Sequence, residues 1–417
     1  MRKIQIKEIF NSNQENIKLS NYDFINYLDT SSITMNHVDN IQKLSVGKDT
    51  IPSRAKRVIK KDTIVYSSVR PNLKHYGIIR NPLNNMVAST GFITLDIKDK
   101  TKNDANYMYY NLTQDKYTDY LHTIACNNVS SYPSINPSDI EDMEIEIETD
   151  INKQKEIAKL FVDIDKKIEL NNKINLELEN FAKALYEYWF VQFDFPDEFG
   201  RPYKSSGGKM IYNDILKWEI PENWTNGILA DISSTQTGYA FKSCDWKDKG
   251  HPVLTIKVIE NNSINMSEAS FIENYQEKYS KYSVENGNII LAMTGNTIGK
   301  IGIIACDIKN ILINQRVCIY KTDYSNIAYL YFNLLSEGIQ NKIWQIGQNS
   351  SQPNISEEQL KQLPIVLPPN ELLHKYNKIF SYSFERIVKN NIENQQLSKL
   401  RDFLLPMLMN GQVTIHQ

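Results

Sequence analysis

The spacing of hydrophobic positions predicts two long helices. From Phe161 to Trp189, apolar or asparagine positions recur at alternating intervals of three and four residues, which is typical of a coiled-coil seam. The first seam consists of Phe161, Ile164, Ile168, Asn171, Asn175, Leu178, Ala182, Leu185 and Trp189. A second seam near the end of the chain consists of Phe380, Ser383, Ile387, Asn390, Asn394, Leu397, Arg401 and Leu404.

Both seams place two asparagines at their centre. A seam asparagine lowers stability but pairs best with another asparagine, so it fixes the register of two helices. We therefore predict an antiparallel coiled coil in which the asparagines face each other. A helix from Phe161 to Trp189 would be about 42 Å long at 1.5 Å per residue and would hold two globular parts apart. The alternative is two separate amphipathic helices, each packed on its own domain.

Outside the seams, the pattern changes to short strand-like runs bounded by Gly, Pro, Asn and Ser. Such runs cover residues 63–67, 91–97, 288–293 and 316–320, and residues 143–148 alternate between apolar and acidic. Short helices fit residues 105–121 and 326–345. Because these pieces form no βαβ series, the globular parts are predicted to be α+β with a mostly antiparallel or mixed sheet.

The chain carries an internal repeat of about half its length. Residues 64–67 match 289–292, and residues 77–79 match 302–304, both at an offset of 225. Later blocks match in the same order while the offset shrinks to 219. We predict two repeated α+β domains separated by two long helices that form a pseudo-twofold symmetric, antiparallel coiled coil. The expected parts are residues 1–149, a central helical spacer at 150–192, a connector and second domain at 193–368, and a C-terminal helical spacer at 369–417.

The composition excludes several classes of protein. The 417 residues carry a formal charge of −2, so the chain is not a globally basic nucleic-acid binder and only local basic patches remain possible. No apolar run is long enough to span a membrane, and residues 1–16 lack the core of a signal peptide. The four cysteines form no CxxC pair and are expected to be buried small side chains rather than disulfide or zinc ligands. We expect a cytoplasmic protein.

The motifs of common enzymes are missing. The run from Gly295 to Lys300 resembles a phosphate loop, but it has three residues between the glycines where four are needed, and Ile301 stands where Ser or Thr should bind magnesium. No GxGxxG, HExxH or GxSxG run occurs, and no two of the six histidines stand at metal-ligand spacing. We therefore expect a binding or scaffolding subunit with no catalytic residue, no metal site and no cofactor of its own.

Candidate DNA contacts lie in a basic run of the first repeat and in polar loops at equivalent positions of the two repeats. Residues 53–61 contain five cations, which could neutralise phosphates, and the polar loops carry side chains able to read base edges. The alternatives are a solvated surface for the basic run and ordinary turn chemistry for the loops. The candidates are Arg54, Lys56, Arg57, Arg70, Asn72, Lys74, Asn128, Tyr132, Thr294, Asn296, Thr297, Lys300, Arg316, Gln348, Asn349 and Gln352.

Three blocks carry a resemblance to a known family. Residues 185–196 with 200–210, residues 352–369 and residues 400–411 are similar to the central signature and C-terminal repeat of the specificity subunit of type I restriction-modification systems. Two helix starts depart from that pattern: residues 150–157 lack the usual Pro-Pro approach, and residues 370–374 lack a common Glu-Gln pair.

The resemblance implies that each globular part is a target-recognition domain reading one half of an interrupted double-stranded DNA sequence. The helices would set the gap and dock two modification subunits, which bind S-adenosylmethionine and methylate adenine. Restriction subunits, with a translocase and nuclease that use ATP and Mg, would complete the complex. Both domains would grip the major groove of one duplex, with centres on the order of 35 Å apart. The alternatives are a coiled-coil scaffold for other proteins and an orphan specificity protein without active DNA recognition.

Overall fold

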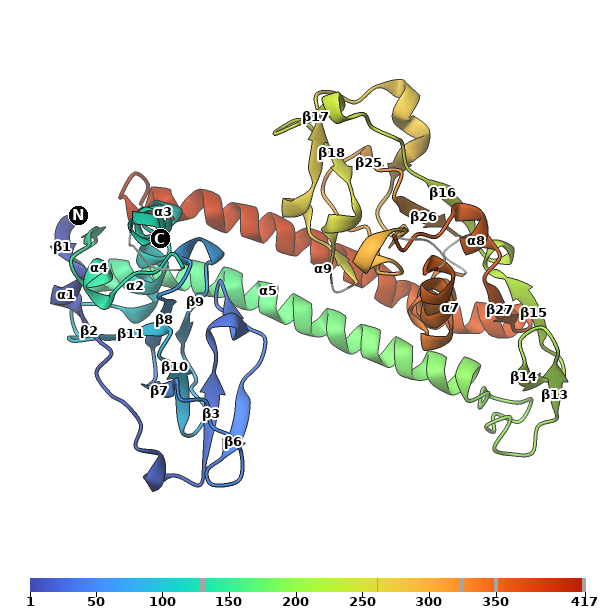
Figure 1. Ribbon diagram of the computed structural model, residues 1–417, viewed down its shortest axis with the longest axis horizontal. Coiled ribbons are helices and arrows are strands. Elements are labelled where there is room, and N and C mark those ends of the chain that lie inside the picture. The colour runs from blue at the N-terminus through green and yellow to red at the C-terminus, as the bar shows by residue number, and fades with distance from the viewer. Residues whose placement is uncertain (128–131, 261, 323–325, 349–351, 415–417) are drawn as a thin grey trace. The chain divides into compact units, whose positions relative to one another are not determined.

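The computed structural model describes residues 1–127, 132–260, 262–322, 326–348 and 352–414 (Figure 1). The chain divides into two compact units. Unit 1 is Met1–Lys166 with Leu397–Gln417, and unit 2 is Lys167–Gln396. Both boundaries fall inside the long helices α5 (Ile151–Tyr186) and α9 (Asn370–Met409), so each unit contains a globular part and one stretch of each helix.

Unit 1 contains two four-stranded sheets and two strand pairs. The first sheet is antiparallel with the order β2-β11-β8-β9; the second has the order β6-β3-β10-β7, with β3 and β10 parallel. A separate pair joins β1 to β12. The bounds are β1 Arg2–Gln5, β2 Phe10–Ser12, β3 Phe24–Leu28, β6 Gln42–Ser45, β7 Ala55–Val58, β8 Thr63–Ser67, β9 Tyr76–Ile79, β10 Met86–Ser89, β11 Phe92–Ile97 and β12 Glu144–Ile147; the small hairpin is β4 Ile33–Thr34 and β5 His37–Val38.

Unit 2 repeats the first sheet of unit 1, and its second sheet has five strands. Its first sheet has the order β16-β26-β23-β24, its second has the order β17-β21-β18-β25-β22, and β15 pairs with β27. The strand order of the first sheet and the terminal strand pair therefore recur at the predicted repeat, which confirms two mixed-sheet α+β repeats. The bounds are β15 Thr225–Ile228, β16 Ser234–Thr237, β17 Trp246–Lys247, β18 His251–Leu254, β21 Ser270–Ile272, β22 Ser283–Val284, β23 Ile289–Ala292, β24 Ile301–Ile303, β25 Ile311–Ile313, β26 Val317–Lys321 and β27 Pro364–Leu367; additional pairs are β13 Met210–Asn213 with β14 Trp218–Pro221 and β19 Ile259–Glu260 with β20 Ser263–Ile264.

The two ranges predicted to form short helices each contain two of them. Residues 105–121 form α2 (Ala105–Leu112) and the start of α3 (Asp115–Asn127), and residues 326–345 form α6 (Ile327–Leu335) and most of α7 (Glu337–Gly347). Ser336 accepts a hydrogen bond from the backbone N–H of Ile339, so it caps α7 and ends the run of helical backbone. Short helices α1 (Ile6–Ile9), α4 (Pro137–Glu141) and α8 (Glu357–Lys361) complete the two units.

A row of aromatic rings joins the first sheet of unit 1 to α5. Tyr66 of β8 stacks on Tyr76 of β9 at 5.3 Å, and ring contacts continue through Tyr109 and Tyr110 of α2 to Phe161 of α5. Burial raises the pKa of Tyr66 to about 12. The row fixes the start of α5 against the globular part because large buried rings contribute strongly to core packing.

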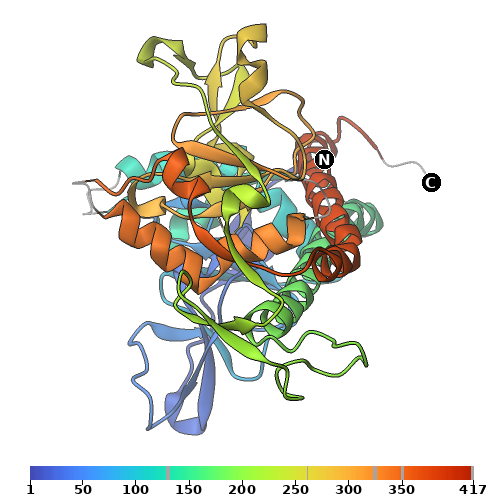
Figure 2. The same cartoon turned by 90° about the vertical axis from the view of Figure 1, so that its right-hand side faces the viewer.

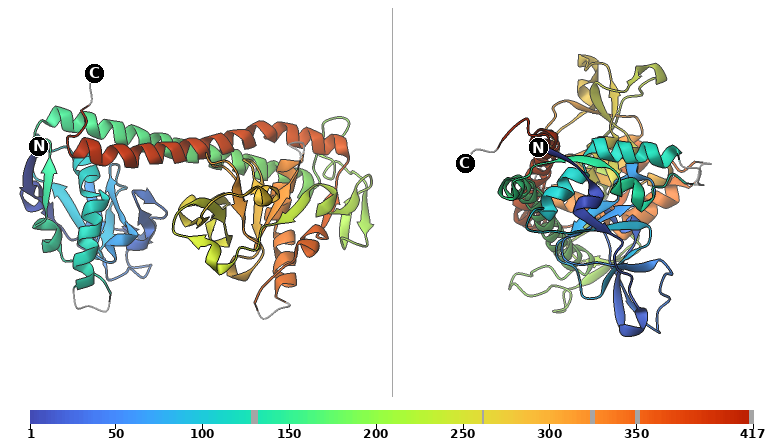
Figure 3. Two further views of the ribbon diagram at one scale, coloured as in Figure 1. Left: turned by 90° about the horizontal axis from the view of Figure 1, so that it is seen from above. Right: turned by 90° about the vertical axis from the view of Figure 1, so that its left-hand side faces the viewer.

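The predicted asparagines meet within unit 2, where α5 and α9 run in opposite directions (Figure 3). Asn171 Nδ2 donates to Asn394 Oδ1 at 2.9 Å, and Asn175 Nδ2 donates to Asn391 Oδ1 at 2.8 Å. Asn390 Nδ2 donates to Asn175 Oδ1 at 2.7 Å. The predicted seam residues are all buried or half-buried; they are Phe161, Ile164, Ile168, Asn171, Asn175, Leu178, Leu185, Phe380, Ile387, Asn390, Asn394, Leu397 and Leu404.

The same helices also pack on the globular part of unit 2. Tyr376 of α9 contacts Tyr186 of α5 at 6.4 Å, and Phe384 lies 5.2 Å from Tyr331 of α6. Figure 2 looks along α9 (red), with α6 and α7 (orange) to one side. Within unit 2, α5 and α9 therefore contact each other, as in the predicted coiled coil, and α9 also packs on the globular part, as in the alternative.

The end of the chain belongs to unit 1. Lys116 Nζ of α3 donates to Asn410 Oδ1 at 2.9 Å, and a Cβ at Gly411 would lie 3.2 Å from the side chain of Met1. Arg401 of α9 forms an ion pair with Asp165 of α5 at 3.0 Å. The first residues and the last described residues therefore pack within one compact unit.

The cysteines only partly follow the expectation of burial. Cys306 and Cys318 are buried, whereas Cys126 and Cys244 are exposed. Among the described helices there is none that combines the length and apolar character needed to cross a membrane.

Candidate nucleic-acid interface

Three segments of unit 1 are joined at one end of its first sheet. They are the turn after β8, the turn before β11, and the segment after α3. The backbone N–H of Ser68 donates to the carbonyl of Gly91 at 2.8 Å, the N–H of Arg70 donates to Pro133 at 2.9 Å, and the N–H of Ile135 returns to Ser68 at 2.8 Å. We call this arrangement the three-segment frame.

Unit 2 contains the same frame at the repeat positions. The backbone N–H of Met293 donates to the carbonyl of Arg316 at 2.9 Å, the N–H of Gly295 donates to Pro353 at 2.9 Å, and the N–H of Ile355 returns to Met293 at 3.0 Å. The three bonds join positions that the sequence repeat pairs with those of unit 1. The loops predicted to be equivalent are therefore equivalent in backbone structure, although their side chains differ.

The frame of unit 1 brings Arg70 and Tyr132 together. The Arg70 guanidinium lies 5.3 Å from the centre of the Tyr132 ring, whose residue is 61% exposed. Asn72 is exposed in the single helical turn Pro71–Leu73. Cation–π contact orients a guanidinium while leaving its N–H groups available to an incoming acceptor. Asn128 lies outside the described residues.

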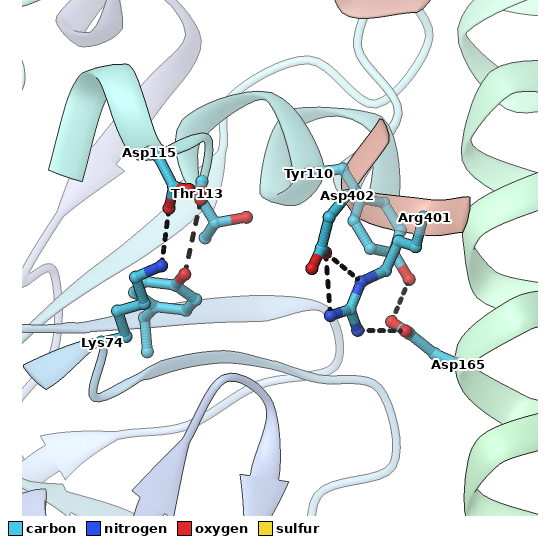
Figure 4. Close-up of polar contacts among 8 residues, drawn as sticks. Lys74, Tyr110, Thr113, Asp115, Asp165, Arg401 and Asp402 are labelled. Atoms are coloured by element: carbon cyan, nitrogen blue, oxygen red, sulfur yellow. Dashed lines mark hydrogen bonds and ion pairs between the residues drawn. The ribbon is translucent and has the colours of Figure 1, made fainter. Parts of the chain in front are cut away.

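Lys74 is engaged within the protein. Its ammonium lies 2.6 Å from Asp115 at the start of α3 (Figure 4). A carboxylate at this distance competes with a phosphate for the same charge. This placement favours a role for Lys74 in joining the turn after β8 to α3.

In unit 2 the frame surrounds a hollow that contains three of the predicted residues. Thr294, Arg316 and Gln352 line it. The remaining lining residues are Met293, Gln315, Pro353 and Asn354. The hydroxyl oxygen of Thr294 is buried and has no hydrogen-bond partner within the described part of the chain. The lining contains several amide groups and no acidic side chain, which suits contact with base edges or phosphates.

Four other predicted residues of unit 2 lie outside this hollow. Asn296 and Thr297 belong to the turn Gly295–Thr297, where the Thr297 hydroxyl donates to the Thr294 carbonyl at 3.2 Å. Lys300 lines a separate hollow between β19 and α7. Gln348 follows the last turn of α7, and Asn349 lies outside the described residues.

The basic run is a strand and its flanks, not the surface loop considered as an alternative. Residues 55–58 form β7 at the edge of the second sheet. Arg54 and Lys56 are exposed, and the Arg54 carbonyl accepts from Thr90 N–H at 2.8 Å, next to the frame. Arg57 is half-buried, donates to Asn16 Oδ1 at 3.2 Å, and has its pKa lowered by burial. Arg54 and Lys56 are therefore exposed to an outside ligand, whereas Arg57 is engaged within the protein.

A half-buried charge cluster lies where α5 and α9 meet within unit 1 (Figure 4). Arg401 Nη1 is 3.0 Å from Asp165 Oδ1, and the Tyr110 hydroxyl donates to the other Asp165 oxygen at 2.5 Å. Burial alone would lower the pKa of Arg401, but the charges of Asp165 and Asp402 outweigh burial and raise the pKa above its usual range. Burial also raises the pKa of Tyr110 well beyond its ordinary value. The three-residue network fixes both helices to α2.

The described residues bring together no group of three or more His, Cys, Asp or Glu side chains that could hold a metal ion. The repeated polar frames are the features of this structure that fit ligand recognition. A family comparison decides the assignment: the model of the type I restriction modification DNA specificity domain matches residues 1–180 and 221–400. The chain belongs to this family.

Curated relatives agree with the family assignment. The specificity subunit of the type I restriction enzyme HindI from Haemophilus influenzae is 24% identical and is matched over 87% of this chain and 89% of the relative. The MjaIX specificity subunit from Methanocaldococcus jannaschii is 25% identical, over 87% of this chain and 80% of the relative. The crystal structure of a type I restriction-modification S subunit from M. genitalium shares the fold, with 15% identity, a TM-score of 0.54 and coverage of 98% and 96%.

Both family-matched regions of this specificity-domain chain contain a complete three-segment frame. The sequence prediction missed two polar residues of the unit 2 hollow, Gln315 and Asn354. Asn354 stands one position before Ile355 in a block already matched to residues 131–135, and Gln315 precedes the predicted Arg316. The repeat therefore held the signal, but it did not show which turns face each other.

Proposed function

We propose that this chain is the DNA-recognition subunit of a type I restriction-modification complex and that each unit reads one half of an interrupted target. The observation that carries this proposal is the three-segment frame, which occurs twice with the same backbone bonds and different exposed side chains. A constant backbone with variable side chains is suited to reading two different sequences. Contacts to base edges determine which sequence is bound, whereas contacts to phosphates only position the protein on the duplex.

The helices α5 and α9 would set the gap between the two half-targets. The asparagine contacts of unit 2 and the Arg401–Asp165 pair of unit 1 hold these helices in register. An antiparallel coiled coil with pseudo-twofold symmetry would match the two-part symmetry of such a target. The exposed faces of the helices would dock two modification subunits.

The partners would supply the chemistry. Modification subunits would bind S-adenosylmethionine and methylate adenine, and restriction subunits would use ATP and Mg. Flipping of the target base would take place in the modification subunit, because a base must leave the stack to reach an active site. This chain would bind double-stranded DNA and contribute recognition without catalysis.

The test is co-expression of this chain with the modification subunit encoded beside it, in a host that lacks adenine methylation. Sequencing of methylated adenines should give one interrupted motif that disappears when this chain is omitted. Unmodified DNA from a stably co-purifying pair would indicate a scaffold or an orphan subunit and would contradict the proposal. A gel shift with the pair should show the same sequence preference.

A further inference from the structure

Each frame has an arginine on one of its two facing turns and a glycine on the other, and the two residues are in swapped positions in the two units. In unit 1 the turn after β8 carries Arg70 and the turn before β11 carries Gly91. In unit 2 the position equivalent to Arg70 is Gly295, and the position equivalent to Gly91 is Arg316, both at the repeat offset of 225. Each frame therefore holds one arginine, but the two arginines come from opposite turns.

We propose that Arg70 and Arg316 are specificity-determining residues, each reading a guanine in its own half of the target. This inference rests on the proposed function and deepens it, because it names the residues and the base. A guanidinium presents two parallel N–H donors that match the O6 and N7 acceptors of guanine in the major groove, and no other base pair offers that arrangement to arginine as well.

The backbone joins the two positions directly. In unit 1 the Ser68 N–H bonds to the Gly91 carbonyl, and Arg70 follows two residues after Ser68. In unit 2 the Met293 N–H bonds to the Arg316 carbonyl, and Gly295 follows two residues after Met293. The two turns are therefore hydrogen-bonded neighbours in each frame, so an arginine on either turn begins close to the same point.

Space and backbone conformation explain which turn carries the arginine in unit 1. A Cβ at Gly91 would lie 2.8 Å from Thr30 Cγ2, so that turn admits no side chain unless Thr30 moves. Arg70 has a φ of 50°, a left-handed conformation that non-glycine residues rarely adopt. Strained residues of this kind concentrate at functional sites, which favours a role for the Arg70 side chain beyond the turn itself.

Neither guanidinium is neutralised by a described carboxylate. Arg70 lies over the Tyr132 ring, a contact that leaves its donors unused. Arg316 is exposed and makes no side-chain hydrogen bond or ion pair with the residues that the structure describes. The hollow beside it is lined by neutral side chains, including Thr294, Gln315 and Asn354. Both arginines are thus held at a polar site with donors available to an outside acceptor.

The test compares methylated motifs after single substitutions in the complex with the modification subunit. Arg316→Ala should relax the motif at one guanine of one half-target, with a loss of discrimination of roughly 10- to 100-fold, and should leave the other half unchanged. Arg70→Ala should do the same in the other half. Lys309→Ala and Arg2→Ala, exposed cations away from the frames, are the matched controls and should leave both halves unchanged.

A relocation variant tests the equivalence of the two turns. The double variant G295R/R316G places the arginine where unit 1 carries it, and Gly295 has open space and a φ of 69° close to that of Arg70. The guanine requirement lost in R316G should return in the double variant. Thermal unfolding of R316A should match the wild type, because the Arg316 side chain makes no hydrogen bond or ion pair with the described residues. G295R/R316G should unfold at a lower temperature, because an arginine at the φ of 69° of Gly295 is strained, so its motif is compared with that of R316G at a temperature where both are folded.

Several outcomes would overturn the inference. An unchanged motif in R316A and R70A would do so, as would a wild-type half-target without guanine, or a double variant that regains no base requirement. Uniformly weaker binding to every sequence would instead identify phosphate contacts and also overturn it. A wild-type complex that methylates no motif would contradict the proposed function itself, before either arginine is tested.

Discussion

Asn175 and Asn390 hold each other across two helices: Asn390 Nδ2 donates to Asn175 Oδ1 at 2.7 Å, while Asn175 Nδ2 donates onward to Asn391. Asn390 is only 1% exposed. An amide buried this deeply is stabilised only in the register that offers its partner. The pair therefore selects one alignment of α5 and α9 in unit 2.

Replacing one member of this pair should destabilise the protein. Asn390→Leu leaves the Asn175 carbonyl oxygen without this donor, which should cost about 1–2 kcal/mol of unfolding free energy. The double variant N175L/N390L should recover part of that loss because neither amide remains buried alone. Denaturant unfolding checks this, with the exposed Glu177→Ala as the control; equal losses in the single and double variants would contradict it.

Shortening the helices should change the gap but not the half-targets. Deleting residues 168–174 together with the facing residues 391–397 removes one heptad from each helix and keeps Asn175 opposite Asn390. Seven residues correspond to about 10.5 Å of helix, or about three base pairs. Sequencing of methylated adenines should show the same two half-targets with a shorter gap. An unchanged gap would refute the role of the helices in spacing.

The Arg401–Asp165 pair should be needed for the stability of unit 1. The two side chains are 18% and 20% exposed, so Arg401→Leu leaves a largely buried carboxylate without its cation. We expect a loss of about 3 kcal/mol. The double variant D165N/R401L should be more stable than R401L, because no unpaired charge remains. Arg386→Ala, on an exposed position of α9, is the control, and thermal unfolding is the measurement.

Lys56 and Arg57 are neighbours in β7 with different expected roles. Lys56→Ala should lower the salt dependence of DNA binding by about one unit of slope, because one phosphate contact is lost. Arg57→Ala should leave that slope unchanged and reduce thermal stability, since Arg57 is half-buried and bonded to Asn16. Gel shifts over a salt series separate the two. Lys48→Ala, in an exposed turn, is the matched control, and equal slopes for K56A and wild type would identify β7 as a solvated strand.

The thiols should react in two classes. Cys126 and Cys244 are exposed and should react with a thiol reagent in the folded protein, whereas Cys306 and Cys318 are buried and should react only after unfolding. Burial raises the pKa of Cys318 to about 12, so its thiolate is scarce at neutral pH. A colorimetric titration should count two thiols natively and four in denaturant; four at once would contradict the described burial.

The sequence predicted the parts of the fold that depend on local pattern. The run 63–67 is β8 in full, because a short run of β-branched and aromatic residues bounded by turn residues is typical of a strand. The alternating run 143–148 contains β12, because period-two alternation is a direct signature of a half-buried strand. The asparagines of the seams also predicted which parts of α5 and α9 meet. The helix breaks were missed, since a cap such as Ser336 depends on one local bond inside an otherwise helical run.

The site could be predicted only in part. The repeat identified the loop of Arg70 and the loop of Thr294 as equivalent, and the structure joins each to its proline-containing segment. The turn before β26 faces Thr294 because β26 lies next to β23 in the sheet. No local sequence pattern encodes that strand order. The pairing of Lys74 with Asp115 was also invisible, because those residues are far apart in the chain.

Unit 1 combines two stretches that lie far apart in the sequence. Lys116 reaches Asn410, and Asp165 reaches Arg401, so the first stretch acquires these partners only after Arg401 and Asn410 have been translated. During translation, unit 1 therefore completes its packing after the residues of unit 2 have been made. A truncation before Arg401 would thus destabilise unit 1 as well as shorten α9.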